Sequence, residues 1–188
     1  MKKNHTNKIK VWDPLVRIFH WSLVLFFFLA YFTEDEWIGI HSSAGYTIAL
    51  LVLFRLLWGF IATYKTALFS HFVTHPVVAY HYLRQELKGN AKRYLGHNPA
   101  GAAMVLMLLT SLFITASCGM TLFATEGHGF LANTFFAELP AGIIKELHEF
   151  FANFTLLLII AHVGGVILSS KLHKENLVMA MITGKKKP

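Results

Sequence analysis

The segment LHEFFANFTLLLIIAHVGG, residues 147–165, decides the fold because it places two histidines in an apolar run long enough to enter a membrane. His148 and His162 are 14 residues apart, a separation of about 21 Å at the helical rise of about 1.5 Å per residue. At about 100° per residue, these 14 residues fall only about 40° short of four full turns. A helix over this segment therefore presents two imidazoles on one face at two different depths.

The composition of the whole chain points to a membrane protein. Of its 188 residues, 55% are hydrophobic and only 14% are charged, whereas a soluble domain carries about 25% charged residues. This balance argues against a soluble globular enzyme, and the high apolar content excludes a disordered chain. Cys118 is the single cysteine, which excludes disulfide frameworks, cysteine-rich zinc sites, iron–sulfur clusters and a covalently attached c-type haem. The eleven histidines need another explanation.

Four apolar runs approach the length of roughly 20 residues that crosses about 30 Å of hydrocarbon. They cover residues 15–33, 41–64, 99–123 and 143–168. The more polar stretch 66–95 is predicted to form one or two amphipathic helices on the inner membrane surface. We therefore predict an all-α fold with a single domain over residues 1–188, an integral membrane four-helix bundle with an amphipathic cytoplasmic segment between the second and third spans.

The distribution of charge predicts the orientation of this bundle, because lysines and arginines in short loops stay on the cytoplasmic side. The two loops on the other side carry acidic residues at 34–36, 126 and 138, with Lys145 as their single cation. Both termini are therefore predicted to be cytoplasmic. The net charge of +7 is explained by this topology and by anionic lipid, so no nucleic-acid partner is expected. The cytoplasmic cations are Lys2, Lys3, Lys8, Lys10, Arg17, Lys65, Arg84, Lys88, Lys92, Arg93, Lys171, Lys174, Lys185, Lys186 and Lys187.

Four histidines fall at two matching depths in the predicted spans. His20 lies near the cytoplasmic end of the first span, level with His162, and His41 opens the second span on the outer side, level with His148. Two imidazoles opposed across a bundle supply both axial ligands of a b-type haem, since the porphyrin supplies four nitrogens. The pattern predicts two non-covalent b-type haems, the inner one on His20 and His162 and the outer one on His41 and His148.

Other residues are candidates for contacts with these haems. Arg55 lies 14 residues after His41, hence on the same helix face at the depth of the inner pair, where it would neutralise haem propionates. The alternative for Arg55 is a side chain that snorkels to the cytoplasmic surface. Arg17, one turn before the first ligand, is a second candidate for the propionates. Gly45 and Gly165 each lie within about one turn of a predicted ligand and would let a flat macrocycle approach.

Several alternatives stay open at this point. A single intramembrane histidine is more often a packing or hydrogen-bonding residue than a ligand. A zinc-type metal site would gather three or four ligands at one depth, and a proton relay would include acidic residues, whereas only Glu149 lies near the histidines. A haem-free helical transporter is the remaining rival of a cytochrome.

Several motifs resemble the bacterial cytochrome b-561 family, which includes the b-type cytochrome subunits of nickel–iron hydrogenases. They are VWDPLVRIFHW at 11–21, IHSSAGY at 40–46, RLLWG at 55–59, GHNPAGA at 96–102 and the stretch at 147–165. The resemblance covers most of the chain and implies a four-helix membrane protein with two b haems. It also implies axial ligands at positions that match His20, His41, His148 and His162.

The resemblance implies a function as well. Proteins of this family pass electrons between a membrane quinone pool, ubiquinone or menaquinone, and a redox partner. We expect a bacterial inner-membrane cytochrome whose partner is a periplasmic c-type cytochrome or redox enzyme, and the alternative is a superoxide:quinone oxidoreductase that uses the same two haems. Closed six-coordination argues against ligand chemistry at the iron, so an enzyme label fits only as a quinone-coupled oxidoreductase and no catalytic residue is expected.

Overall fold

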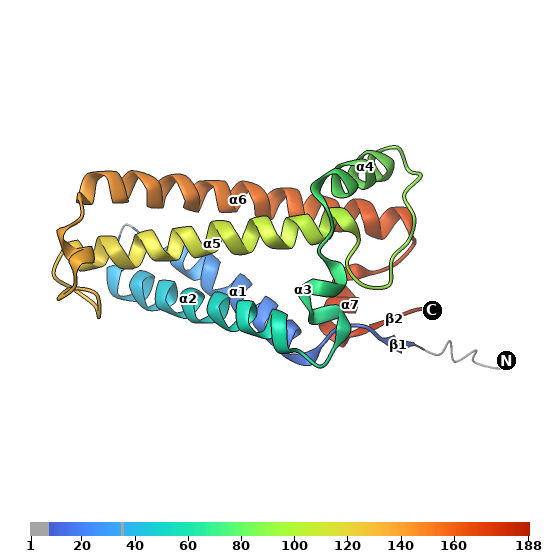
Figure 1. The fold of residues 1–188 in the computed structure, drawn as a ribbon, viewed down its shortest axis with the longest axis horizontal. Coiled ribbons are helices and arrows are strands. Elements are labelled where there is room, and N and C mark those ends of the chain that lie inside the picture. The colour runs from blue at the N-terminus through green and yellow to red at the C-terminus, as the bar shows by residue number, and fades with distance from the viewer. Residues whose placement is uncertain (1–7, 35) are drawn as a thin grey trace. The chain divides into compact units, whose positions relative to one another are not determined.

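The computed structural model describes residues 8–34 and 36–188 and is an all-α membrane helical bundle. Its four long helices, each apolar and long enough to cross a membrane, correspond to the four predicted spans (Figure 1). The predicted fold class is therefore confirmed. Lys2, Lys3 and Asp35, which enter the charge argument, lie outside the described residues. The long helices are α1 (Pro14–Tyr31), α2 (Ile38–Ile61), α5 (Pro99–Thr125) and α6 (Ala141–Leu172).

Helix α1 begins one residue earlier than predicted because Asp13 caps it. The backbone amide of Leu15 donates to Asp13 Oδ1 at 2.8 Å, and Pro14 stands at a first helical position that tolerates proline. The indole Nε1 of Trp58, near the end of α2, donates to Asp13 Oδ2 at 2.7 Å. Asp13 is only 3% exposed, so one buried carboxylate both starts α1 and ties it to α2.

The ends of α2 and α6 also differ from the predicted spans. Helix α2 begins at Ile38, before His41, because the carbonyl of Trp37 already accepts the amides of Ile40 and His41 at 2.9 Å each. His41 therefore lies inside the first turn of α2 instead of opening the helix. Helix α6 begins directly after Pro140 and continues to residue 172, four residues beyond the predicted end.

The chain divides into two compact units. The first unit comprises Met1–Ile18, Leu57–Leu106 and Ile160–Pro188, and the second comprises Phe19–Leu56 and Met107–Ile159. Each of the four long helices contributes a segment to both units. That the chain forms a single domain stays a prediction.

The core of the second unit joins segments of all four long helices. The hydroxyls of Ser111 in α5 and Thr155 in α6 lie 2.7 Å apart, and the two residues are 2% and 0% exposed. Alanines in this core let the helices approach closely. The core consists of Phe27, Ala30, Ala44, Ile48, Val52, Leu112 and Ala116, with Leu156 and Ile159 of α6 packed against it.

The first unit contains the segment that was predicted to lie on the membrane surface. It forms the short helices α3 (Phe69–Phe72) and α4 (Pro76–Leu87). Along α4, Ala79, Tyr82 and Glu86 are buried, whereas Val77, Tyr80 and Leu83 are exposed. The exposed apolar side chains are what a helix lying on a lipid surface needs. The remaining elements are two 3₁₀ helices (Lys65–Ala67 and Phe135–Glu138), helix α7 (Leu177–Thr183) and the strands β1 (Ile9–Lys10) and β2 (Lys185–Lys186).

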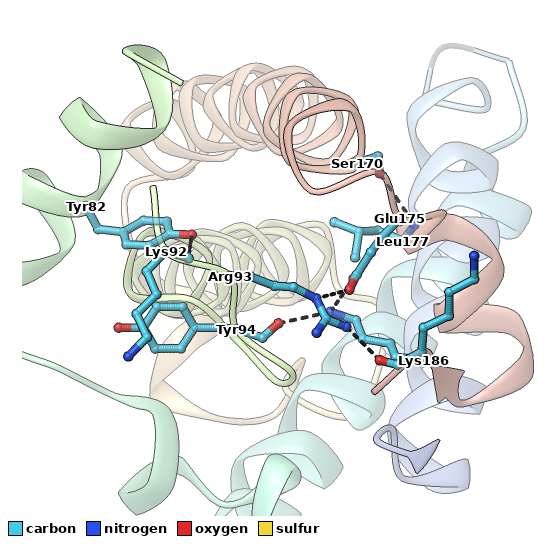
Figure 2. Close-up of polar contacts among 9 residues, drawn as sticks. Tyr82, Lys92, Arg93, Tyr94, Ser170, Glu175, Leu177 and Lys186 are labelled. Atoms are coloured by element: carbon cyan, nitrogen blue, oxygen red, sulfur yellow. Dashed lines mark hydrogen bonds and ion pairs between the residues drawn. The ribbon is translucent and has the colours of Figure 1, made fainter. Parts of the chain in front are cut away.

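Both ends of the described chain meet in the first unit. Strands β1 and β2 pair antiparallel, and Figure 2 shows Glu175 between Arg93 and Lys186. Glu175 forms an ion pair with Arg93 and another with Lys186 at 3.3 Å, while Lys186 Nζ donates to the carbonyl of Tyr94 at 3.3 Å. Burial alone would raise the pKa of Glu175, but the hydrogen bonds and charges of Arg93 and Lys186 bring it below its usual value. We call Arg93, Tyr94, Glu175 and Lys186 the terminal clasp.

Candidate functional site

His41 in α2 and His148 in α6 face each other inside the second unit. Their ring centroids are 6.0 Å apart and their planes are inclined by 80°. His41 Nδ1 lies 2.9 Å from the carbonyl oxygen of Ala30, and His148 Nδ1 lies 2.9 Å from that of Thr115. A carbonyl only accepts, so each Nδ1 carries the proton and donates it. Each ring therefore keeps its Nε2 lone pair for a metal, as in metal-binding histidines whose other nitrogen is held by an outer partner.

A cavity of about 440 Å³ lies beside the two rings and is lined by all four long helices within the second unit. Small residues form much of its wall, including Gly45, Ala116, Gly119 and Ala152. A Cβ atom added at Gly45 would meet no other atom within 4 Å, so open space lies next to α2 there. This space is compatible with a flat group that enters between the helices, and the predicted haem contact of Gly45 stays a prediction.

The absence of a side chain at Gly119 leaves room for the imidazole ring of His148. A Cβ atom at this position would lie 2.8 Å from His148 Cε1 and 3.1 Å from His148 Nδ1, too close for an unshifted ring. The side chain of Thr115 donates to the carbonyl of Ser111 at 2.9 Å, while its own carbonyl accepts from His148. Sequence reasoning missed Gly119 and Thr115, and the only available signal was a glycine inside an apolar helix, which often marks close packing.

The spacing of the two rings can be compared with that of two imidazoles bound to one metal ion. A metal–imidazole bond of about 2.0–2.1 Å, taken from zinc sites as a scale, places the centroids of two opposed rings about 6 Å apart. No group of three or more histidine, cysteine, aspartate or glutamate side chains among residues 8–34 and 36–188 could hold a metal ion. The remaining ligands would have to come from a prosthetic group, and a porphyrin supplies four nitrogens. The observed His41–His148 geometry is therefore compatible with a bis-histidine haem.

The predicted inner ligands belong to different units. His20 lies in the second unit, where its ring packs edge-on against Trp21 at 5.0 Å, and His162 lies in the α6 segment of the first unit. Their pairing stays a prediction. Arg55 is 2% exposed, so its side chain lies inside the protein, which weighs against the snorkelling alternative.

Arg17 and Gly165 lie in the first unit. The Arg17 guanidinium donates to the carbonyl of Ile182, so it ties α1 to α7. Gly165 is exposed, and a Cβ atom there would meet nothing within 4 Å, which leaves room beside α6. The predicted haem contacts of both residues stay predictions.

Charged and polar side chains also line the cavity of the second unit. Glu34, Glu126, Lys145 and Glu149 contribute to its wall and are all exposed. Lys145 and Glu149 form an ion pair at 3.7 Å with side chains 65% and 58% exposed, a geometry that contributes little energy. The buried hydroxyl of Tyr46, which also lines the cavity, has no hydrogen-bond partner within the described part of the chain. It is a spare donor for a bound group.

Comparison with known proteins identifies a family. The family model described as prokaryotic cytochrome b561 matches residues 11–184. No curated protein and no solved structure matches the chain.

Proposed function

The chain belongs to the prokaryotic cytochrome b561 family, and on this premise we propose that it is a dihaem cytochrome that carries electrons across the inner membrane. As a family member with four apolar helices, it is a multi-pass bacterial membrane protein that contacts lipid, binds b-type haem and transfers electrons. The proposal adds two non-covalent haems, a quinone at one end of the path and a periplasmic redox partner at the other. Haem supplies reversible one-electron chemistry when it is bound between two imidazoles.

The observation that carries the proposal is the pairing of His41 with His148. The two side chains would hold the outer haem iron from opposite sides, and the carbonyls of Ala30 and Thr115 fix the orientation of the rings. Hydrogen bonds of this kind also raise the basicity of the ligand nitrogen. Gly45 leaves space for the macrocycle and Gly119 leaves space for the His148 ring, and the Tyr46 hydroxyl, which has no hydrogen-bond partner within the described part of the chain, can donate to one of the haem carboxylates.

The proposed ligands of the inner haem are the other two histidines. His20 and His162 would hold its iron. Arg55 lies inside the protein, and its planar guanidinium matches the geometry of a carboxylate, which supports a role in neutralising the propionates. Arg17 and Gly165 are further candidates at this haem. The four histidines would bind and orient the haems, and with two histidines on each iron no substrate is expected to bind at the metal.

Both termini are proposed to lie in the cytoplasm. The pairing of Ile9 with Lys186 in the β1–β2 sheet brings the two terminal segments together, which supports their lying on one side of the membrane. The concentration of lysine and arginine in the same segments favours the cytoplasmic side. The outer haem would then face the periplasm, and any c-type haem in the path would belong to another protein because this chain has one cysteine.

Reduction of the protein by a quinol tests this function. The purified haem-loaded protein in liposomes is mixed with a short-chain ubiquinol or menaquinol, and the absorbance of reduced haem is followed against a dithionite end point. We expect one of the quinols to reduce the haems to a large fraction of that end point. Full reduction by dithionite with no reduction by either quinol would refute the quinone coupling.

A further inference from the structure

Three carboxylates stand at the cavity that holds His41 and His148. Glu34 follows α1, Glu126 follows α5 and Glu149 lies on α6, and each lines this cavity and is exposed. We call these three residues the rim carboxylates. Among the residues that the structure describes, Lys145 is the one cation that lines the cavity. Its exposed ion pair is with Glu149, so within this part of the chain the other two rim carboxylates face no cation in the cavity wall.

The exposed charged side chains on the rest of the second unit are also mainly negative. Among its described residues, the lysines and arginines are Lys145 and Arg55, and Arg55 is buried. Membrane topology explains why cations are few on an outer surface, but acidic residues contribute little to topology. The excess of negative charge therefore needs a reason of its own. The exposed carboxylates are Glu34, Glu36, Glu126, Glu138, Glu146 and Glu149.

The rim carboxylates line the same cavity as His41 and His148. An electron carrier that exchanges with an outer haem on His41 and His148 must approach this cavity, and the rim carboxylates are the charges that it meets there. A field of one sign around a cleft raises the encounter rate of oppositely charged partners by about 10-fold to 1,000-fold and lowers that of like-charged ones.

We propose that the surface around the rim carboxylates docks a soluble redox protein that presents a cationic face around its own redox centre. The inference rests on the proposed function and names the charge of the outer partner. One electron passes between the outer haem and the partner's redox centre in each encounter, and no bond forms or breaks. The same field repels small anionic electron donors such as superoxide, so it favours the protein partner over the superoxide alternative.

Two small oxidants of opposite charge test the sign of this surface. The haem-loaded protein is reduced, freed of reductant and mixed in a stopped-flow instrument with hexaammineruthenium(III), a cation, or with ferricyanide, an anion. Each takes one electron, and the loss of reduced-haem absorbance gives the rate. The measurement is made at pH 8, where histidine is ordinarily neutral, at ionic strengths of about 0.01 M and about 1 M, where the Debye length is about 30 Å and about 3 Å.

The decisive variant carries Glu34→Gln, Glu126→Gln and Glu149→Gln together. At low ionic strength, we expect it to slow oxidation by the cation by about 3-fold to 10-fold and to speed oxidation by the anion, since steering of this kind is electrostatic. At high ionic strength both differences should largely disappear.

A matched control removes three other exposed carboxylates of the same unit that do not line the cavity, through Glu36→Gln, Glu138→Gln and Glu146→Gln. The net charge changes equally, so a docking surface centred on the cavity predicts a distinctly smaller effect. Equal effects of the two triple variants, no effect of either, or a cation rate that does not rise as salt falls would overturn the inference.

The haem content of each protein distinguishes a failure of the proposed docking surface from a failure of the proposed function. The reduced spectrum of each variant is recorded first, and if the rim triple variant has lost haem, Glu34→Gln and Glu126→Gln are measured singly. Wild-type protein with haem whose oxidation ignores the charge of the reagent refutes the docking surface alone. Wild-type protein that holds no haem refutes the proposed function and the docking surface together.

Discussion

The imidazole rings of His41 and His148 lie 6.0 Å apart with their planes inclined by 80°. The rings come from α2 and α6, and the carbonyls that hold them come from Ala30 in α1 and Thr115 in α5. All four long helices thus contribute to one pair of side chains. Hydrogen bonds to backbone carbonyls therefore set the relative orientation of the two rings.

This orientation predicts the electronic state of the oxidised outer haem. Axial ligation tunes the iron, and two nearly perpendicular imidazole planes leave the iron orbitals that meet the ligand π systems close in energy, whereas parallel planes separate them. We expect a low-spin ferric signal of high anisotropy in the electron paramagnetic resonance spectrum, lost in His148→Ala. An outer-haem signal of the rhombic type that parallel imidazoles give would contradict the observed geometry.

Substitution of Gly119 by alanine is expected to displace His148. The added methyl group would lie 2.8 Å from His148 Cε1, so the ring must shift away from the carbonyl of Thr115. Outer-haem occupancy should fall several-fold, measured as haem per protein, while the inner haem stays. Gly142→Ala on α6 is the control, because a Cβ atom there meets nothing within 4 Å and alanine stabilises a helix by about 0.5–1 kcal/mol over glycine. Equal haem content in the two variants would argue against the close packing of Gly119 and His148.

Removal of the buried charge of Arg55 is expected to affect the inner haem. If the guanidinium neutralises the propionates, Arg55→Leu lowers the reduction potential of that haem by roughly 60 mV, a tenfold change in a one-electron equilibrium. Arg55→Lys keeps the charge without the bidentate geometry and should lie between the wild type and Arg55→Leu. A redox titration in which Arg55→Leu matches the wild type would remove Arg55 from the haem site.

The terminal clasp is expected to open in acid. Interactions with Arg93 and Lys186 hold the pKa of Glu175 below its usual value, so the carboxylate stabilises the folded clasp fully above the ordinary glutamate pKa of about 4.3. This stabilisation is lost as the pH falls through the lowered folded-state pKa. Amide exchange at residues 185–187, normalised to the intrinsic rate, should therefore rise between about pH 4 and about pH 2.

Glu175→Gln provides the comparison for this clasp. It removes the charge at every pH, so exchange at residues 185–187 should already be fast at pH 7 and should lose its acid-dependent step. The same step in Glu175→Gln and in the wild type would assign the pH dependence to another group.

The sequence was sufficient to predict the class of fold. It also singled out His41 and His148, whose rings lie 6.0 Å apart in the structure, while their role as haem ligands stays a prediction. The period of a helix is enough to predict that His148 and His162 share one face. The length of a span is enough to predict the depth of His41 in the membrane. The contacts of the His148 ring with the Thr115 carbonyl and with Gly119 could not be predicted in this way, because they depend on how α5 packs against α6. The start of α1 was misplaced because its cap, Asp13, is held by a tryptophan far along the chain.

Haem content of the histidine variants tests most directly whether this chain is a dihaem cytochrome. A pyridine haem assay and a reduced-minus-oxidised spectrum are recorded for the wild type, for alanine variants of His20, His41, His148 and His162, and for His128→Ala as an exposed control. We predict two haems per chain in the wild type and in the control, and loss of one haem in each of the four ligand variants. The remaining haem should be the same one in His20→Ala and His162→Ala, and the other one in His41→Ala and His148→Ala. A blank spectrum in the wild type, or two haems retained in His41→Ala and His148→Ala, would contradict the dihaem assignment.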